Sequence, residues 1–163
     1  MLNCLNAKLR NGFTLIESIV AIFLLTVGAV GAFSLLQSTL AFASVYSSQL
    51  TAAYLAQEGI EIIRNIRDTN FLEGGAWDGG IGVGADYRLN YQSGNFPDPV
   101  CGNYLKHNGS FYACSSDSGS KFQRKITIAK PEPDKMTISV EVSWSERGRI
   151  HQVFSQSELY NWR

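Results

Sequence analysis

The chain has 163 residues, enough for one small domain and an additional segment. Its 14 basic and 14 acidic side chains give a formal net charge of zero, which argues against a protein held to nucleic acid by bulk electrostatics. Apolar residues are concentrated near the N-terminus, and no later stretch is comparably apolar. We therefore expect one membrane segment, with everything after it on one side of the membrane.

A polar leader precedes this segment and carries Lys8 and Arg10 but no acidic residue. Between Phe13 and Leu36 the only ionisable side chain is Glu17. As a helix with a rise of ~1.5 Å per residue, this run spans about 36 Å and exceeds the ~30 Å core of a bilayer. Basic residues just before a membrane segment keep that end in the cytoplasm, so we expect the N-terminus inside and the C-terminus outside.

A short motif stands where the leader meets the apolar run. Its residues are Gly12, Phe13, Thr14, Leu15, Ile16 and Glu17. The motif resembles the N-terminal signature of type IV prepilins and of type II secretion pseudopilins. This resemblance covers residues 1–40. It implies that a membrane-embedded prepilin peptidase cuts after Gly12 and methylates the new amine of Phe13. A secretory signal would instead carry its cleavage site after the apolar stretch.

Glu17 is a carboxylate at membrane depth, where a charge costs roughly 2.5–3.5 kcal/mol on insertion scales, so it should have a partner. The resemblance implies one, because cleavage gives Phe13 a protonatable α-amine. Glu17 can meet that amine within one chain or on a neighbouring subunit. A second explanation is that Glu17 favours the helix N-terminus through the helix dipole, an effect of ~0.3–1 kcal/mol.

Helical periodicity continues beyond the apolar run. One face carries Ala52, Leu55, Ala56, Gly59, Ile63 and Ile66. We expect one helix from about Thr14 to Ile66, whose second half packs on a globular head. Arg64 is spaced to pair with both Glu61 and Asp68 along the helix surface.

Six glycines lie between Gly74 and Gly84. Residues 80–85 fit the loose G-x-G-x-x-A pattern of dinucleotide sites, which requires a strand before it and a helix after it. Here a helix precedes the pattern and a strand-like alternation follows it, so we interpret the segment as a loop.

Three cysteines are present: Cys4 before the membrane segment, and Cys101 and Cys114 after it. If the downstream part is exported, Cys101 and Cys114 can form a disulfide, which adds about 3 kcal/mol on the chain-entropy model. A competing interpretation is a metal site of these thiols with His107, but a fourth ligand and the usual C-x-x-C spacing are missing. A turn is predicted at Asn108-Gly109, between the two cysteines.

The last third of the chain alternates apolar and polar residues over residues 121–130, 135–145 and 149–159, which predicts an antiparallel meander. Turns at "PEPD" and "ERG" join these strands. The faces of the meander are expected to include Ile126 and Ile128, then Ile138, Val140, Val142 and Trp144, and then Ile150, Gln152 and Phe154. One face of the sheet should cover the amphipathic half of the helix.

This arrangement agrees with the pilin fold, which is α+β: a long N-terminal helix, membrane-spanning in its first half, packed on a C-terminal antiparallel sheet. The expected parts are a leader (1–12), a transmembrane and assembly helix (13–36), its amphipathic continuation (37–66), a glycine-rich connecting loop (67–84) and a sheet head with a disulfide-pinned loop (85–163). The segments "AYLAQEGIEIIRNIR" and "VEVSWSERGRIHQVFSQSELYNWR" resemble PilV-type minor pilins and minor pseudopilins, in pattern more than in identity.

No side chains suggest catalysis, since His107 and His151 are far apart in sequence and no serine lies in a nucleophile-elbow context. We expect no enzyme activity, cofactor or metal. The resemblance implies a minor pilin of a type IV pilus or pilus-like fibre, anchored by a single pass in the cytoplasmic (inner) membrane with its head outside. Its partners would be the prepilin peptidase and methyltransferase, other pilins or pseudopilins, the pilus assembly machinery and, before assembly, membrane lipid. Nucleic acid is not expected among them.

Two alternatives remain open. The chain can be a minor pseudopilin of a type II secretion system, which drives export as a short piston. It can also be a single-pass membrane-anchored binding domain that forms no fibre. Cleavage after Gly12 separates both fibre subunits from the binding domain.

Overall fold

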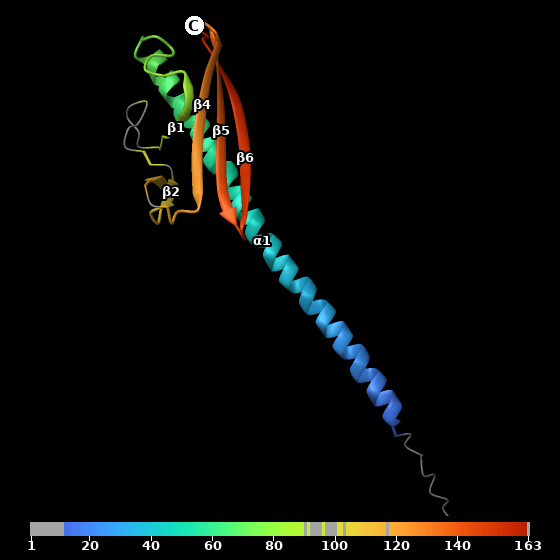
Figure 1. Cartoon of the computed structure of the whole chain (residues 1–163). Helices are drawn as coiled ribbons and strands as arrows, with labels where there is room; N and C mark the ends of the chain where they lie inside the picture. Colours follow the sequence, from blue (N-terminus) through green and yellow to red (C-terminus); the bar gives the residue numbers. More distant parts are fainter. Residues whose placement is uncertain are drawn as a thin grey trace, which may run out of the picture. The chain divides into compact units, whose positions relative to one another are not determined.

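The computed structural model describes residues 12–89, 91, 96, 101–102, 104–116 and 118–162. It shows one long helix packed against a six-stranded antiparallel sheet (Figure 1). The elements are α1 (Leu15–Leu72), β1 (Gly84–Tyr87), β2 (Tyr104–His107), β3 (Tyr112–Ser115), β4 (Phe122–Glu132), β5 (Lys135–Glu146) and β6 (Arg149–Tyr160). The α+β class predicted from the sequence is confirmed.

The chain forms two compact units, Met1–Ser44 and Val45–Arg163. The second unit, which we call the head, contains the later part of α1 and the whole sheet. The strand order is β3-β2-β4-β5-β6, and β1 pairs with β4 on a separate branch. The three long strands β4, β5 and β6 are those that the alternating pattern predicts.

The core of the head lies between α1 and the inward face of the long strands. The helix contributes Ala52, Leu55, Ala56, Gly59, Ile60 and Ile63, and the strands contribute Phe122, Ile126, Ile128, Met136, Ile138, Val140, Val142, Trp144 and Leu159. Gly59 allows the closest approach, because a Cβ there would stand 3.0 Å from Val140 Cγ1 and 3.2 Å from Arg124 Cδ. The helix face predicted from periodicity is therefore the buried one, although Ile66 is only half-buried.

The helix ends at Leu72, so the predicted end at Ile66 is too early. Phe71 extends the buried stripe, with its ring centroid 4.7 Å from that of Trp162. Termination follows at Gly74, whose φ is +74°: its N–H donates to the Phe71 carbonyl (3.3 Å), and the next residue, Gly75, donates to the Asn70 carbonyl (2.9 Å). This is a Schellman cap, and the left-handed position that it requires favours glycine.

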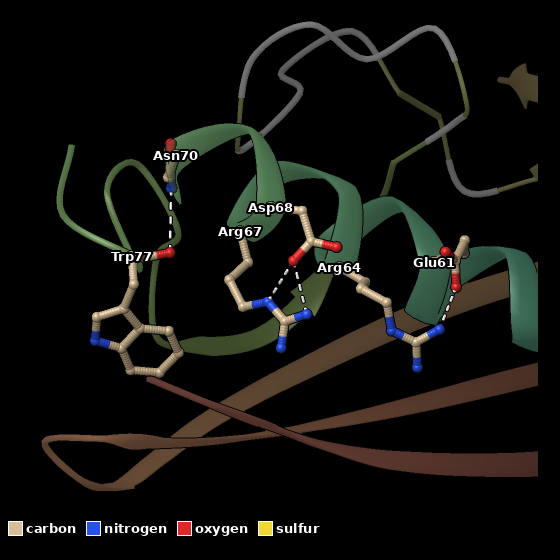
Figure 2. A network of polar contacts seen from close by, with 6 residues as sticks. All are labelled: Glu61, Arg64, Arg67, Asp68, Asn70 and Trp77. Carbon is tan, nitrogen blue, oxygen red and sulfur yellow. Dashed lines mark hydrogen bonds and ion pairs between the residues drawn. The ribbon is translucent and has the colours of Figure 1, made fainter. Parts of the chain in front are cut away.

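Asn70 also fastens the following loop to the helix. Its side-chain amide donates to the carbonyls of Trp77 (3.3 Å) and Gly79 (2.8 Å), and Figure 2 shows the first of these bonds. Trp77 is buried, so the glycine-rich connection is packed against the head.

The predicted surface ion pairs of the helix are half correct. Arg64 contacts Glu61 at 2.5 Å, as expected, but Asp68 pairs at 2.7 Å with its neighbour Arg67 and not with Arg64 (Figure 2). Arg64 is already engaged by Glu61, and the side chain of Arg67 is only 12% exposed and lies beside Asp68. The pair of Arg64 and Glu61 is exposed, and exposed pairs typically add little to stability.

The inward face of β6 differs from the predicted one. A two-residue turn at Arg147-Gly148, both with positive φ, sets Trp144 opposite His151. That register turns Ile150 and Phe154 outward, where they are 77% and 68% exposed. The core-facing positions of β6 are instead the odd-numbered ones: His151, Val153, Ser155, Ser157 and Leu159. A shift of one residue exchanges the two faces of a strand, and the turn decides which face is inward.

Candidate functional site

The N-terminal motif lies at the first turn of α1. Thr14 precedes the helix, and its Oγ1 accepts a hydrogen bond from the backbone N–H of Glu17 (3.3 Å), while its carbonyl accepts one from the N–H of Ser18 (3.1 Å). Thr14 is therefore the N-cap, and Glu17 occupies the third helical position, as in a capping box. The T-x-x-E spacing of Thr14 and Glu17 is the sequence signal for this cap.

Gly12 and Phe13 lie outside the helix, immediately before the cap. Phe13 is 84% exposed, and a Cβ added at Gly12 would meet nothing within 4 Å. The chain itself can thus accommodate a larger side chain at position 12. The fold of the chain therefore gives no reason for a glycine at position 12.

The first half of α1 is apolar on all sides and exposed. In the described part of the chain, α1 is the one helix long and apolar enough to span a membrane, and none of its most apolar stretch, with mean hydropathy 2.5, is buried. Ile16, Glu17, Val20, Ala21 and Leu24 line a shallow groove on its surface. A helix that is hydrophobic all round requires lipid or other helices around it. Together with the motif at its start, this helix supports a single-pass membrane anchor.

The fold and the N-terminal segment thus describe an anchored structural subunit with a small sheet head. Residues 7–33 match the family model for the prokaryotic N-terminal methylation motif. The N-terminal part of the chain is therefore similar to that of type IV pilin and pseudopilin precursors. The motif implies processing by a prepilin peptidase and assembly with other pilins. The comparisons with curated proteins and with solved structures found no match.

In the head, Cys101 and Cys114 form a disulfide, with their Cα atoms 4.9 Å apart. The bond joins the segment before β2 to β3, the strand that pairs with β2. His107 is exposed and its Nδ1 accepts a hydrogen bond from the N–H of Gly109 (3.3 Å) within the predicted turn. A metal site would need the thiolates that the disulfide consumes. Cys4 lies outside the described residues.

Arg124 is a buried charge that the sequence analysis did not identify. Its guanidinium donates to the carbonyls of Leu55 on α1 (2.9 Å) and Leu89 after β1 (2.5 Å), and it lies 3.2 Å from the Glu58 carboxylate. Burial lowers the pKa of Arg124, and the negative charge of Glu58 opposes that shift. The sequence carries a signal for this burial. Arg124 is two residues from the inward-facing Phe122, so the two side chains lie on the same face of β4.

A second polar contact holds the glycine-rich loop to the sheet. Lys130 of β4 donates a hydrogen bond to the carboxylate of Asp78 and lies over the ring of Trp77, 5.4 Å from its centroid. The hydrogen bond from Lys130 holds the pKa of the Asp78 carboxyl below its usual value of 3.8. This contact between Lys130 and Asp78 fixes the glycine-rich loop on the sheet. No similar ion pair is found among the described residues of the N-terminal motif.

The predicted site residues belong to two different units of the chain. Gly12, Phe13 and Glu17 lie at the start of α1, in the first unit, and the disulfide lies in the head. Among the described residues, no group of three or more His, Cys, Asp or Glu side chains gathers as it would around a metal ion. The pilin-type motif points to a structural subunit.

Proposed function

We propose that the chain is the precursor of a minor pilin of a type IV pilus or pilus-like fibre. It is cut after Gly12, methylated on Phe13 and assembled through the helix that begins there. Before assembly it crosses the inner membrane once, with the leader in the cytoplasm and the head outside. The observation that carries this proposal is the position of Gly12-Phe13 immediately before the N-cap of an exposed apolar helix.

The location of Glu17 gives a physical reason for its carboxylate in this proposal. Cleavage would place the positive amine of Phe13 at the N-terminus of α1, where the helix dipole already contributes partial positive charge. Glu17 is in the first turn of the helix and can neutralise that charge. In an assembled fibre the same carboxylate can pair with the amine of a neighbouring subunit, which would make insertion of each new subunit depend on it.

The proposal is tested by the intact mass of the membrane-extracted protein. We expect a chain that begins at Phe13 and carries one added methyl group. Gly12→Val should leave the precursor uncut, because the fold tolerates a larger residue there and only the peptidase would reject it. Gly31→Val, at another glycine with open surroundings, should still be cut. A native chain that begins at Met1 or beyond Leu36 would refute the proposal.

The role of Glu17 is tested by substitution in a strain that also expresses the unaltered partner subunits. Glu17→Ala removes a charge at membrane depth, so it should insert at least as well as the original chain. It should nevertheless enter fibres poorly, because the amine of Phe13 loses its partner. Glu17→Asp retains the charge and serves as the matched control. Normal incorporation of Glu17→Ala would refute the pairing.

Two features favour a minor subunit: the glycine-rich connection and the disulfide-pinned loop, both suited to a specific place in a fibre. The sequence pattern similar to PilV-type minor pilins points the same way. The second candidate is a minor pseudopilin of a type II secretion system, which shares the motif matched at residues 7–33. Isolation of the chain with its cross-linked partners separates the two, because a pseudopilin is recovered with secretion components. The neutral net charge gives no support to DNA binding.

A further inference from the structure

The strand β6 is an unprotected edge of the sheet. It has 12 residues and, among the described residues, pairs with β5 alone, without a register shift. It contains no proline and no lysine, and its charges, Arg149 and Glu158, lie near its two ends. Proteins commonly protect edges with short strands, bulges, proline or lysine. The opposite edge, β3, has only 4 residues, and the Cys101–Cys114 disulfide holds it.

The register identifies which backbone groups of β6 face away from the sheet. Asn161 donates its N–H to the carbonyl of Asp134 (2.9 Å), and the Arg147-Gly148 turn closes on the pair Glu146–Arg149. In an antiparallel ladder every second residue bonds its neighbour, so the odd-numbered residues of β6 bond β5. The even-numbered residues, from Ile150 to Tyr160, therefore direct both their N–H and C=O groups outward. Among the described residues, these groups have no backbone partner.

The side chains of the same even-numbered residues lie on the outward face of the sheet. Ile150 and Phe154 are large, apolar and more than two-thirds exposed. The stretch between Arg149 and Glu158 carries no formal charge at neutral pH when His151 is neutral. The backbone and side chains together therefore suit one kind of partner: another extended strand with apolar side chains on this face.

The direction of β6 argues against a symmetric pair of two copies. Near its start, Lys121 Nζ contacts both Ser48 Oγ (2.5 Å) on α1 and Glu146 Oε2 (3.2 Å) before the turn. Just past its end, the ring of Trp162 packs at a tilt against that of Phe71, near the end of α1. Within the head, β6 thus runs in the same direction as α1. Two β6 strands paired antiparallel would place the Val45 ends of their heads on opposite sides, although both heads follow anchors in one membrane.

We propose that the β6 edge accepts an extended strand from a different membrane-anchored subunit, adding a strand to the sheet beside β6. This inference rests on the proposed function, since it requires neighbouring subunits held in one orientation. The anchor helix would then bring subunits together, and the β6 edge would select which head stands next to this one. Main-chain hydrogen bonds provide binding, and contacts with the exposed side chains of Ile150 and Phe154 provide selectivity.

Hydrogen exchange of the assembled protein tests the edge directly. Full-length protein is compared in isolated fibres and as detergent-extracted subunit, with peptides that cover residues 149–160. The even-numbered amides should exchange about tenfold more slowly, or slower still, in fibres, whereas β5 already protects the odd-numbered ones in both states. Equal exchange of the even-numbered amides in the two states would overturn the proposal.

Substitution supplies the second arm of the test. Gln156→Pro removes an outward N–H, which an edge strand tolerates, and Gln156→Ala is the matched control that keeps the N–H. Phe154→Lys leaves the backbone intact and places a charge on the edge. Both Gln156→Pro and Phe154→Lys should reduce recovery in fibres about tenfold, or about 1.4 kcal/mol, while Gln156→Ala stays at the original level. Normal incorporation of both Gln156→Pro and Phe154→Lys into fibres would overturn the proposal, even if the extracted Gln156→Pro chain were less stable.

A photo-reactive phenylalanine analogue in place of Phe154 identifies the occupant. The cross-linked product should contain one copy of this chain and one different anchored subunit, and a product made of two copies would overturn the proposal. The mass of each variant also reports cleavage after Gly12. If cleavage and Glu17 dependence are intact while the β6 variants assemble normally, only the edge proposal fails. If cleavage is absent, the proposed function fails and the edge proposal falls with it.

Discussion

At the scale of single residues, Arg124 is a buried side chain whose polar contacts connect distant parts of the head. It is 3% exposed, and it joins three segments that are distant in sequence: α1, β4 and the segment after β1. Its charge has a partner in Glu58, and its donors reach carbonyls that the fold otherwise buries. Such a group is costly to bury but more costly to remove, because its partners are then left unpaired.

We expect Arg124→Ala to lower the free energy of unfolding of the extracted full-length chain by about 3 kcal/mol, mainly because the Leu89 carbonyl loses its donor in a buried place. Chemical denaturation followed by tryptophan fluorescence measures this. The control is Lys125→Ala, an exposed neighbour on the other face of the strand, which should change stability by about 0.5 kcal/mol or less. Similar effects of the two substitutions would contradict the role assigned to Arg124.

The contact between Asp78 and Lys130 predicts a pH dependence. Because the folded-state pKa of Asp78 lies below 3.8, its contribution to stability is complete above that pH and is lost as the pH falls through the folded-state pKa. Asp78→Asn should therefore be less stable than the original chain at pH 7 by about 0.2–1 kcal/mol, the range of exposed pairs. The difference should shrink as the pH is lowered from 7 to about 2, because the Asp78 carboxyl becomes protonated as the pH falls through its folded-state pKa. A difference that is the same at both pH values would contradict this assignment.

At the scale of elements, local bonds set the ends of α1 and close contact fixes its place on the sheet. The N-cap at Thr14 starts the helix, and the Schellman cap at Gly74 stops it. Between them, Gly59 lets the helix backbone approach β5 at Val140. Elsewhere in a helix, glycine is unfavourable by roughly 1 kcal/mol relative to alanine, so its use at position 59 reflects packing.

Gly59→Ala tests that contact. The added methyl group would be 3.0 Å from Val140 Cγ1 and should destabilise the head by about 1 kcal/mol, after the gain in helix propensity is subtracted. Val140→Ala in the same chain should relieve the clash, with a coupling of about 1 kcal/mol in a double-mutant cycle. Gly28→Ala, where the methyl meets nothing within 4 Å, is the control and should not destabilise the head. Additive effects of the first two substitutions would exclude the contact.

At the scale of the whole molecule, two surfaces require neighbours. The exposed apolar helix with Glu17 suits a bundle of similar helices, and the β6 edge suits a strand from another head. The edge at β3 is short and held by a disulfide, so it offers no equivalent long strand to a second copy. Within the described residues, the sheet therefore has no pair of complementary long edges with which copies of this chain could repeat indefinitely.

We expect this subunit, expressed with only the peptidase and the assembly machinery, to remain as membrane-bound monomer or small complexes. Addition of the other pilins that carry the same N-terminal motif should bring it into fibres. Electron microscopy of sheared surface material, with immunolabelling of the head, measures this. Long fibres of this chain alone would show that it is a major pilin.

Features that depend on neighbouring residues could be predicted from the sequence. The membrane anchor follows from an uninterrupted apolar run, and the processing motif follows from six consecutive residues that the match at residues 7–33 contains. The three long strands follow from strict alternation, and the Asn108-Gly109 turn follows from residues suited to its backbone. The cysteine pair was also predictable, because it was the only pair on one side of the membrane segment.

Features that depend on contacts between distant segments could not be predicted without the folded structure. One such feature is the packing of Phe71 against Trp162, in the last turn of α1 before its cap at Gly74. The faces of β6 could not be read from its sequence, because apolar residues occur on both. The two-residue turn and pairing with β5 turned Phe154 outward and Ser155 inward. Burial of one face fixes the register of a strand strongly only where other parts of the protein cover that face. Because β6 lies at the edge of the sheet, burial specifies its register less strongly.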